Sequence, residues 1–504
     1  MMATTRPHLS LNSRQQQLAQ LKPLAGPDSG WRRQGIRHAL VVLTEAPVAG
    51  QAVPGLDTLL ATLRRRGEAP ASLQTGPVVG VSAEGLLLSW VWVNPSRTRF
   101  EQQSALCKAL KPLLEEHPQT LALVLTGAAA ARAAVAGPAL HAAWLNGVAL
   151  PTRKSAGKAG IQTIFLQGAA PGDARFEAAR AVAEGNTLAR TLTLFPPNEL
   201  TPGRYRQQIR LLARERGWRL AEYPLARLKS MGAGAFVAVA QGSDPADAAI
   251  VHLQYRGARA RKRVALVGKG ICFDTGGHNL KPAKYMYGMH EDMNGSAVAL
   301  GILSAASRLR LPLVVDCWLA LAQNHISPQA YKQNDVVTAL NGTTIEVVHT
   351  DAEGRMVLAD TLTLAARQQP DLMVDFATLT GSMHTALGSR FSGIFASSTP
   401  LAQLAVAVGD AVGERVVAFP SPADYDPQLD SKVADVKQCT PDGTADHILA
   451  ARFLSRFTAE RPWVHMDLSA SSNEGGLGAV GSDVTGFGVN WGVHFLDSWL
   501  ENKL

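Results

Sequence analysis

Residues 343–356 read Thr-Thr-Ile-Glu-Val-Val-His-Thr-Asp-Ala-Glu-Gly-Arg-Met, and this stretch decides the fold. Its first six residues are rich in β-branched side chains, and apolar residues recur with helical spacing from Met356 onward. The pattern predicts a strand, then a loop that carries Asp351, Glu353 and Arg355, then a helix. Open α/β sheets place their chemistry at such strand-to-helix junctions. Two carboxylates separated by one residue can converge on one metal-sized target.

Taken alone, the acidic pair also fits a simpler role, in which Asp351 and Glu353 complement the helix dipole and Arg355 is a surface partner. The upstream sequence argues against that explanation. Residues 263–267, Arg-Val-Ala-Leu-Val, have a strand pattern that runs directly into Gly-Lys-Gly-Ile-Cys-Phe-Asp-Thr-Gly-Gly at residues 268–277. A second loop with charged side chains is therefore expected at the end of a second strand.

Glycines flank Lys269 and follow Asp274, and we expect them to let the backbone turn tightly around these two side chains. The segment is not a phosphate-binding P-loop, because the G-x-x-x-x-G-K-[ST] spacing is absent. Lys281 and Asp292 follow in the segments Asn-Leu-Lys-Pro and Glu-Asp-Met-Asn-Gly. The charged residues of these segments are thus predicted to gather near the ends of strands.

Four carboxylates in one site would repel one another and raise each other's pKa unless cations compensate their charge. The four are Asp274, Asp292, Asp351 and Glu353. Two metals about 3.5–4 Å apart, bridged by carboxylates and a water, generate hydroxide near neutral pH and polarise a carbonyl. The alternative, a surface ion-pair network, requires glycine-flanked charges to coincide by chance at successive strand ends. The residues therefore predict a hydrolytic two-metal site.

Composition limits the class of protein. With 504 residues, 46% apolar and 18% charged, the chain is long enough for two or more domains. No stretch approaches the roughly 18 consecutive apolar residues of a membrane span, and the N-terminus lacks the apolar core of a secretory signal. The four cysteines have no C-x-x-C spacing, which argues against a zinc knuckle or a disulfide framework. We expect a cytoplasmic protein with reduced thiols and no membrane association.

The net charge of +8 is unevenly placed. Residues 1–170 hold 17 Lys and Arg against 8 Asp and Glu, a balance of +9, which leaves 32 against 33 for the rest. A solvated basic face explains this excess, and affinity for nucleic acid is the alternative.

The chain divides into two α/β parts. Between residues 38 and 166, short apolar runs alternate with helix-like segments, as in a sheet flanked by helices. We assign residues 1–170 to a basic N-terminal α/β domain without a catalytic constellation. Residues 171–195 predict a connecting helix, which two prolines end. Residues 196–504 form the second part and carry all the motifs above.

These motifs resemble the leucine aminopeptidase (cytosol aminopeptidase) family over about residues 190–490. The resemblance rests on Gly268-Lys269-Gly270, Phe273-Asp274-Thr275-Gly276-Gly277, Leu280-Lys281-Pro282, Asp292-Met293 and Thr350-Asp351-Ala352-Glu353-Gly354-Arg355. It implies an α/β protein in which a smaller N-terminal α/β domain precedes a larger catalytic α/β domain with a mixed central sheet flanked by helices. It also implies a metal-dependent aminopeptidase that removes N-terminal amino acids from peptides, with a leucine-like preference.

Carried over by position, the resemblance implies two divalent metal ions per chain, Mn or Zn, with Mg and Co as further candidates. The tighter ion would be held by Lys269, Asp274, Asp292 and Glu353, and the looser one by Asp274, Asp351 and Glu353. The free amine of the peptide would bind a metal and Asp292. A homo-hexamer is implied as well.

The same resemblance assigns roles outside the ligand set. Lys281 would stabilise the oxyanion, and Arg355 would hold a bicarbonate that acts as general base. The pocket for the first side chain of the peptide would be lined by Met289, Thr378 and Gly381.

Five residues depart from the family pattern without removing a ligand. His349 stands in place of the usual Asn, Asn294 in place of Gly, Cys272 in place of Thr, and His278-Asn279 in place of Ile-Ser. A histidine near two metals invites assignment as a ligand, but we expect His349 to brace its loop, because carboxylates already fill both sites. A catalytically silent homologue is disfavoured because every ligand is present. A nucleic-acid-binding protein on the same scaffold is the alternative of a different class.

Replacing Lys269 and Lys281 separately by arginine should distinguish the roles of the two lysines. A metal-bound lysine needs a neutral amine, whereas arginine keeps its proton and presents a larger fork. Lys269→Arg should lose most of the tighter metal. Lys281→Arg should keep both ions and lose kcat by about 10- to 1,000-fold through misplaced donors. Metal stoichiometry per chain checks this: two ions in Lys269→Arg, or fewer than two in Lys281→Arg, would contradict the assignment.

Overall fold

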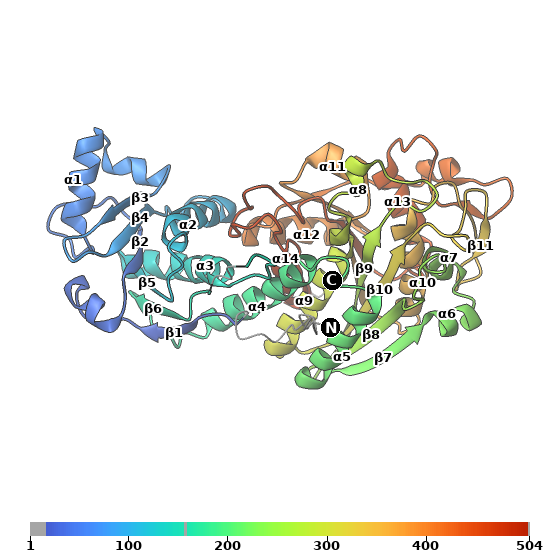
Figure 1. Ribbon diagram of the computed structural model, residues 1–504, viewed down its shortest axis with the longest axis horizontal. Coiled ribbons are helices and arrows are strands. Elements are labelled where there is room, and N and C mark those ends of the chain that lie inside the picture. The colour runs from blue at the N-terminus through green and yellow to red at the C-terminus, as the bar shows by residue number, and fades with distance from the viewer. Residues whose placement is uncertain (1–16, 156–158, 502–504) are drawn as a thin grey trace, which may run out of the picture.

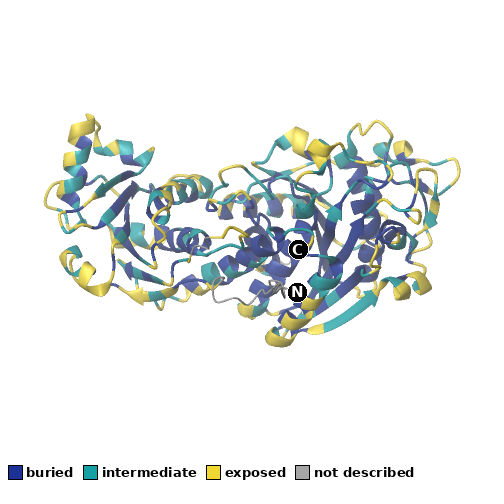
Figure 2. Cartoon of the chain, viewed as in Figure 1, coloured by how far each residue is buried: buried dark blue, intermediate teal, exposed yellow. Residues whose placement is uncertain are grey.

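The computed structural model describes residues 17–155 and 159–501, which form two lobes along one long axis (Figure 1). Residues 1–16, the start of the predicted N-terminal domain, lie outside the described residues. Each lobe contains a sheet with helices beside it, and the strands and adjoining helices are largely buried (Figure 2). The predicted α/β class is confirmed.

The N-terminal lobe is built on a six-stranded sheet. In spatial order its strands are β1 (Gln20–Pro23), β6 (Thr163–Gln167), β5 (Thr120–Thr126), β2 (His38–Leu43), β4 (Leu87–Trp92) and β3 (Val78–Val81). Only β3 runs antiparallel to its neighbour. Its helices are α1 (Leu56–Arg66), α2 (Arg99–Leu114) and α3 (Ala129–Gly147). Part of the basic excess, Arg64, Arg65 and Arg66, forms the exposed last turn of α1.

The larger lobe is built on an eight-stranded mixed sheet. In spatial order its strands are β15 (Val416–Ala418), β14 (Ser392–Ala396), β17 (Trp463–Asp467), β13 (Leu372–Ala377), β9 (Lys262–Asp274), β10 (Leu313–Asn324), β8 (Ala249–Arg256) and β7 (Arg219–Pro224). The four strands β17, β13, β9 and β10 are parallel, so their carboxyl ends meet at one edge. The predicted mixed central sheet is therefore present.

Strand β9 continues through Lys269 to Asp274, so the expected tight turn at the first two glycines is wrong. Gly268 and Gly270 are needed for close packing instead. A Cβ at Gly268 would lie 2.5 Å from the Cα of Ser296 in helix α9 (Asn294–Arg308), and one at Gly270 would lie 2.6 Å from the Leu321 side chain. The turn comes later, at Gly276 and Gly277, whose φ angles are 86° and 66°.

The strand before Asp351 is shorter than the sequence predicts, and it does not belong to the central sheet. It is β12 (Thr344–Glu346), which pairs with β11 (Val336–Thr338) and β16 (Val436–Lys437) in a separate three-stranded sheet. The helix that follows is α10 (Glu353–Ala366), so it begins at the second carboxylate and not at Met356. All fourteen of its residues are buried. The β-branched run therefore reflects a small satellite sheet.

Helix α4 (Arg175–Thr193) joins the two lobes. Phe176 and Ala183 belong to the core of the N-terminal lobe, whereas Val182 and Leu192 belong to the core of the larger lobe. Helix α9 (Asn294–Arg308) crosses α4 where Gly185 meets Gly301. A Cβ on Gly301 would lie 2.6 Å from the Gly185 carbonyl oxygen, so only glycine allows this approach.

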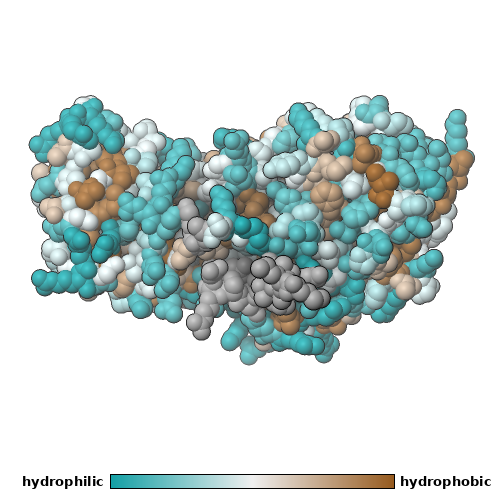
Figure 3. Space-filling view, viewed as in Figure 1, coloured by the Kyte–Doolittle hydropathy of each residue, from teal (hydrophilic) through white to brown (hydrophobic). Residues whose placement is uncertain are grey.

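No helix among the described residues is both long and apolar enough to cross a membrane. The face in Figure 3 is hydrophilic over most of its visible area, with apolar patches on both lobes.

Gly301→Ala should lower stability by about 1–3 kcal/mol, because the added methyl group overpacks the α4–α9 crossing. Gly30→Ala is the matched control, because a Cβ there would meet nothing within 4 Å. Chemical denaturation of both variants beside the parent measures the difference. Equal midpoints for the two variants would contradict the proposed packing role of Gly301.

Candidate functional site

All the predicted site residues line one cavity of about 850 Å³ in the larger lobe. They are Lys269, Asp274, Lys281, Met289, Asp292, Asp351, Glu353, Arg355, Thr378 and Gly381. The cavity lies at the carboxyl edge of the parallel strands, since Asp274 ends β9 and Thr378 directly follows β13. This edge is where open α/β sheets bind ligands.

Lys269 connects two of the carboxylates. Its Nζ lies 2.8 Å from Asp292 Oδ1 and 2.8 Å from Glu353 Oε1, and it also donates to the Thr378 carbonyl at 2.8 Å. The lysine side chain passes directly over Gly354, where a Cβ would lie 2.7 Å from Lys269 Nζ. Glycine at position 354 is therefore what lets Lys269 reach the acids.

Lys281 connects the other two carboxylates. Its Nζ lies 3.0 Å from Asp274 Oδ2 and 2.5 Å from Asp351 Oδ1. Two ammonium groups thus face four carboxylates, which leaves an excess of two negative charges if all four are ionised. Buried charge of one sign is unstable without compensation.

The oxygen atoms fit a metal ion. Asp274, Asp351 and Glu353 each offer one oxygen, and these three atoms lie within 4.8 Å of one another. Asp292 Oδ2 and Glu353 Oε2 are buried and accept no hydrogen bond from the described residues. Buried carboxylate oxygens without donors are rare in proteins, and they are the ligands that hard divalent cations prefer.

The pKa values of the cluster follow from burial and charge. Burial raises the pKa of Asp292 and of Asp351; neighbouring carboxylates raise both further, while Lys269 and Lys281 oppose the shifts. Burial lowers the pKa of Lys269, but Asp292, Glu353 and Asp274 more than reverse that effect. Lys269 therefore holds its proton tightly among these acids, and a metal bound to its nitrogen would have to displace that proton.

Two residues that the sequence analysis did not identify hold the loop before Asp351. Asn324, the last residue of β10, donates from Nδ2 to Asp274 Oδ1 at 2.9 Å and to the Thr350 carbonyl at 3.0 Å. The Tyr331 hydroxyl donates to the same carbonyl at 2.6 Å. No motif marks Asn324 in the sequence, and its position at the carboxyl end of β10 is what brings it to the site.

Gln438 supports the same loop from the small sheet. Its Oε1 accepts the backbone N–H groups of Val348 and His349 at 2.8 and 3.0 Å, and its Nε2 donates to the Ala352 carbonyl at 3.2 Å. Gln438 follows β16 directly and lies 87 positions after Asp351, so no local pattern could have revealed it.

The departures from the family pattern have ordinary contacts, and His278 and Asn279 contact the Tyr331 carbonyl and the Thr350 N–H. His349 lines the cavity, and its Nδ1 accepts the Asp351 N–H at 3.2 Å, so it braces the loop. Asn294 is buried and donates to Thr193 Oγ1 at 3.0 Å, and Cys272 is buried within β9. Neither Asn294 nor Cys272 lines the cavity.

Arg355 has a partner that the sequence analysis did not foresee. Its guanidinium is buried, and Nη1 donates to the Gln438 carbonyl at 3.0 Å. Nη2 donates to both oxygens of Asp446, at 2.8 Å to Oδ1 and 2.7 Å to Oδ2. Asp446 is the first residue of α13 (Asp446–Ser455) and also lines the cavity. The position predicted for bicarbonate therefore faces a carboxylate of the chain itself.

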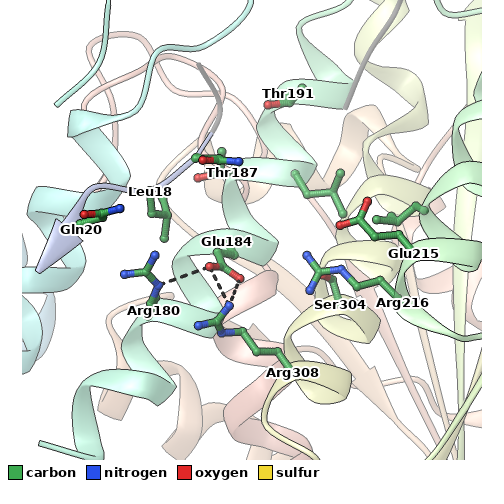
Figure 4. Close-up of a pocket in the computed structure, with 13 residues that line it drawn as sticks. Leu18, Gln20, Arg180, Glu184, Thr187, Thr191, Glu215, Arg216, Ser304 and Arg308 are labelled. Atoms are coloured by element: carbon green, nitrogen blue, oxygen red, sulfur yellow. Dashed lines mark hydrogen bonds and ion pairs between the residues drawn. The ribbon is translucent and has the colours of Figure 1, made fainter. Parts of the chain in front are cut away.

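A second cavity, of about 510 Å³, lies between the start of β1 and helices α4, α5 (Pro202–Arg216) and α9 (Figure 4). There Arg180 and Arg308 both point toward Glu184, at 3.5 and 2.9 Å. The positive and negative charges in this second cavity compensate one another. The carboxylates of the first cavity, here called the acidic cavity, outnumber the lysines that face them.

Comparison with known proteins gives one consistent family. Residues 187–492 match the family model described as "Cytosol aminopeptidase family, catalytic domain". A probable cytosol aminopeptidase of Stutzerimonas stutzeri (strain A1501) is 43% identical over 311 residues, which cover 61% of this chain and 62% of the relative. Another, from Syntrophotalea carbinolica, is 40% identical over 326 residues, which cover 64% and 65%. The chain thus spans somewhat less than two thirds of these relatives.

The similarity to solved structures extends over both lobes. The bottromycin maturation enzyme BotP in complex with Mn superposes with a TM-score of 0.80 at 34% identity, covering 92% of this chain and 99% of BotP. A second BotP structure gives 0.80 at 33%, covering 93% and 100%. The family predicted from the motifs is confirmed.

Gly354→Ala should weaken metal binding by about 10- to 100-fold, the usual effect of disturbing the groups that orient ligands. The added methyl group would displace Lys269 from the acids. Gly381→Ala is the control, because a Cβ at this other cavity-lining glycine meets nothing within 4 Å. Calorimetric titration with Mn²⁺ measures both affinities. An unchanged affinity in Gly354→Ala would show that the position of Lys269 does not matter for the metal.

Proposed function

Because this chain belongs to the cytosol aminopeptidase family, we propose that it is a metal-dependent aminopeptidase that hydrolyses the first peptide bond of peptides with a free N-terminus. The observation that carries the proposal is the cavity in which oxygens of Asp274, Asp351 and Glu353 converge beside two lysines. A cavity with excess negative charge suits divalent cations, and so do the oxygens of Asp292 and Glu353 that accept no hydrogen bond from the described residues. Hydrolysis of the first peptide bond is the reaction expected from the family.

We propose two divalent ions, with Lys269, Asp274, Asp292, Asp351 and Glu353 as the residues that would hold them. Mn is supported by the Mn complex of BotP, and Zn, Mg and Co suit some of the same ligands. The chemistry that such ions supply when bound is acidification of a water molecule and polarisation of a carbonyl.

Lys281 is the proposed oxyanion donor. Burial lowers its pKa, but Asp274, Glu353 and Asp351 together raise it above the usual lysine value, so the side chain is an ammonium. It reaches the cavity from the turn that follows β9 and keeps partial exposure. A fixed positive charge here stabilises an oxygen on which negative charge develops.

Asp292 is the proposed acceptor for the amine of the substrate. The Thr378 hydroxyl donates to its Oδ1 at 2.7 Å, which holds the carboxylate in place. Met289, Thr378 and Gly381 line the cavity beside Leu379, so an apolar first side chain fits there. This lining supports the proposed leucine-like preference.

Three further expectations stay predictions. They are the homo-hexamer, the cytoplasmic compartment and the nucleic-acid alternative. The exposed arginines at the end of α1 lie on the N-terminal lobe, whereas every residue of the proposed chemistry lies on the larger lobe. Nucleic-acid binding would therefore be an activity separate from peptide hydrolysis.

A leucyl peptide with a free amine should be cleaved, and its N-acetylated counterpart should not, because acetylation removes the amine that a metal and Asp292 would bind. Removal of metal by a chelator should abolish turnover, and Mn²⁺ or Zn²⁺ should restore it. Product analysis by mass spectrometry measures both. Comparable cleavage of the acetylated peptide, or full activity in protein shown by elemental analysis to lack metal, would refute the proposal.

A further inference from the structure

Arg355 and Asp446 form an ion pair between helices α10 and α13 at the wall of the acidic cavity. The guanidinium is almost wholly buried, whereas the Asp446 side chain keeps 21% of its exposure. Nη1 of Arg355 is engaged by the Gln438 carbonyl and Nη2 by both oxygens of Asp446. Arg355 is thus held by hydrogen bonds from two sides, and the carboxylate of Asp446 lines the cavity.

A free bicarbonate does not fit this arrangement. To bind Arg355 it would have to displace Asp446, which would leave a carboxylate without its partner, or lie beside that carboxylate against like-charge repulsion. Nε of Arg355 has no partner among the described residues, but it is buried as well. The chain already provides one carboxylate for this guanidinium.

The position of Asp446 is fixed by its neighbours. The backbone N–H of His447 donates to Ser382 Oγ at 2.9 Å, and His447 Nδ1 lies 3.0 Å from the same oxygen. These contacts tie the start of α13 to α11 (Gly381–Leu387), the helix that begins at the cavity. The Asp446 carboxylate therefore has a defined place between Arg355 and the cavity that also holds Asp351 and Lys281.

We propose that Asp446 is the built-in general base of this enzyme and that the chain neither needs nor binds bicarbonate at Arg355. The inference rests on the proposed function. An O–H bond of the attacking water breaks and its proton passes to the Asp446 carboxylate, while the water oxygen forms a bond to the scissile carbonyl carbon and the C=O π electrons move onto the carbonyl oxygen. The π bond then re-forms as the C–N bond breaks, and the leaving nitrogen takes the proton from Asp446. Arg355 keeps its proton and holds the carboxylate in place.

The experiment compares the parent with Asp446→Gly and Asp446→Asn in buffer freed of carbon dioxide, with and without added sodium bicarbonate. The parent should be indifferent to bicarbonate. Both variants should lose kcat by about 100-fold or more, as when a general base is removed. Bicarbonate should restore activity in Asp446→Gly, which leaves space on Arg355, but not in Asp446→Asn, which fills that space. Asp424→Asn, at an exposed acid outside the cavity, is the control and should leave activity unaffected.

A binding measurement gives a readout independent of turnover. Titration of ¹³C-labelled bicarbonate, followed by NMR, should show binding to Asp446→Gly and none to the parent. Stimulation or binding of bicarbonate in the parent would overturn the proposal, and so would full activity of Asp446→Asn. A loss in Asp446→Gly that bicarbonate does not rescue, or that accompanies loss of metal, would make Asp446 structural and also overturn it. If the parent cleaves no peptide, the proposed function fails, while the titration still decides which anion Arg355 holds.

Discussion

The structure depends on holding four carboxylates together inside a protein. Water would screen their repulsion, but Asp274, Asp292 and Glu353 are buried, so the compensation has to come from the chain and from bound cations. Lys269 and Lys281 each connect two of the acids. The remaining negative charge and the unpaired oxygens of Asp292 and Glu353 suit divalent ions. The acidity of the cavity is thus the property from which its chemistry follows.

Close packing makes this concentration of charge possible. Strand β9 can deliver Lys269 and Asp274 to one edge because Gly268 and Gly270 let helix α9 and strand β10 approach it. Gly295, near the start of α9, meets the Phe376 carbonyl at a distance that excludes any Cβ. Gly354 leaves the path for Lys269. The glycines of the motifs therefore serve backbone proximity more than backbone turning.

The pairing of Arg355 with Asp446 shows that a sequence motif does not by itself fix the surroundings of its residues. Arg355 belongs to the contiguous motif at residues 350–355, and Asp446 lies 91 positions away. An arginine that faces a carboxylate of its own chain differs chemically from one that is open to a free anion, because the intramolecular partner is always present. The motif alone does not distinguish the two.

Sequence alone determined the α/β class, the family and the set of charged residues that meet in the cavity, because ligand chemistry restricts the residue types and the motifs keep them at fixed spacing. Only the tertiary structure decided that β12 belongs to a satellite sheet, that β9 continues to Asp274, and that Asn324, Gln438 and Asp446 surround the site. These three side chains act through hydrogen bonds to residues that lie between 26 and 91 positions away along the chain. Such contacts depend on how strands and helices pack, and no local pattern of residues encodes them.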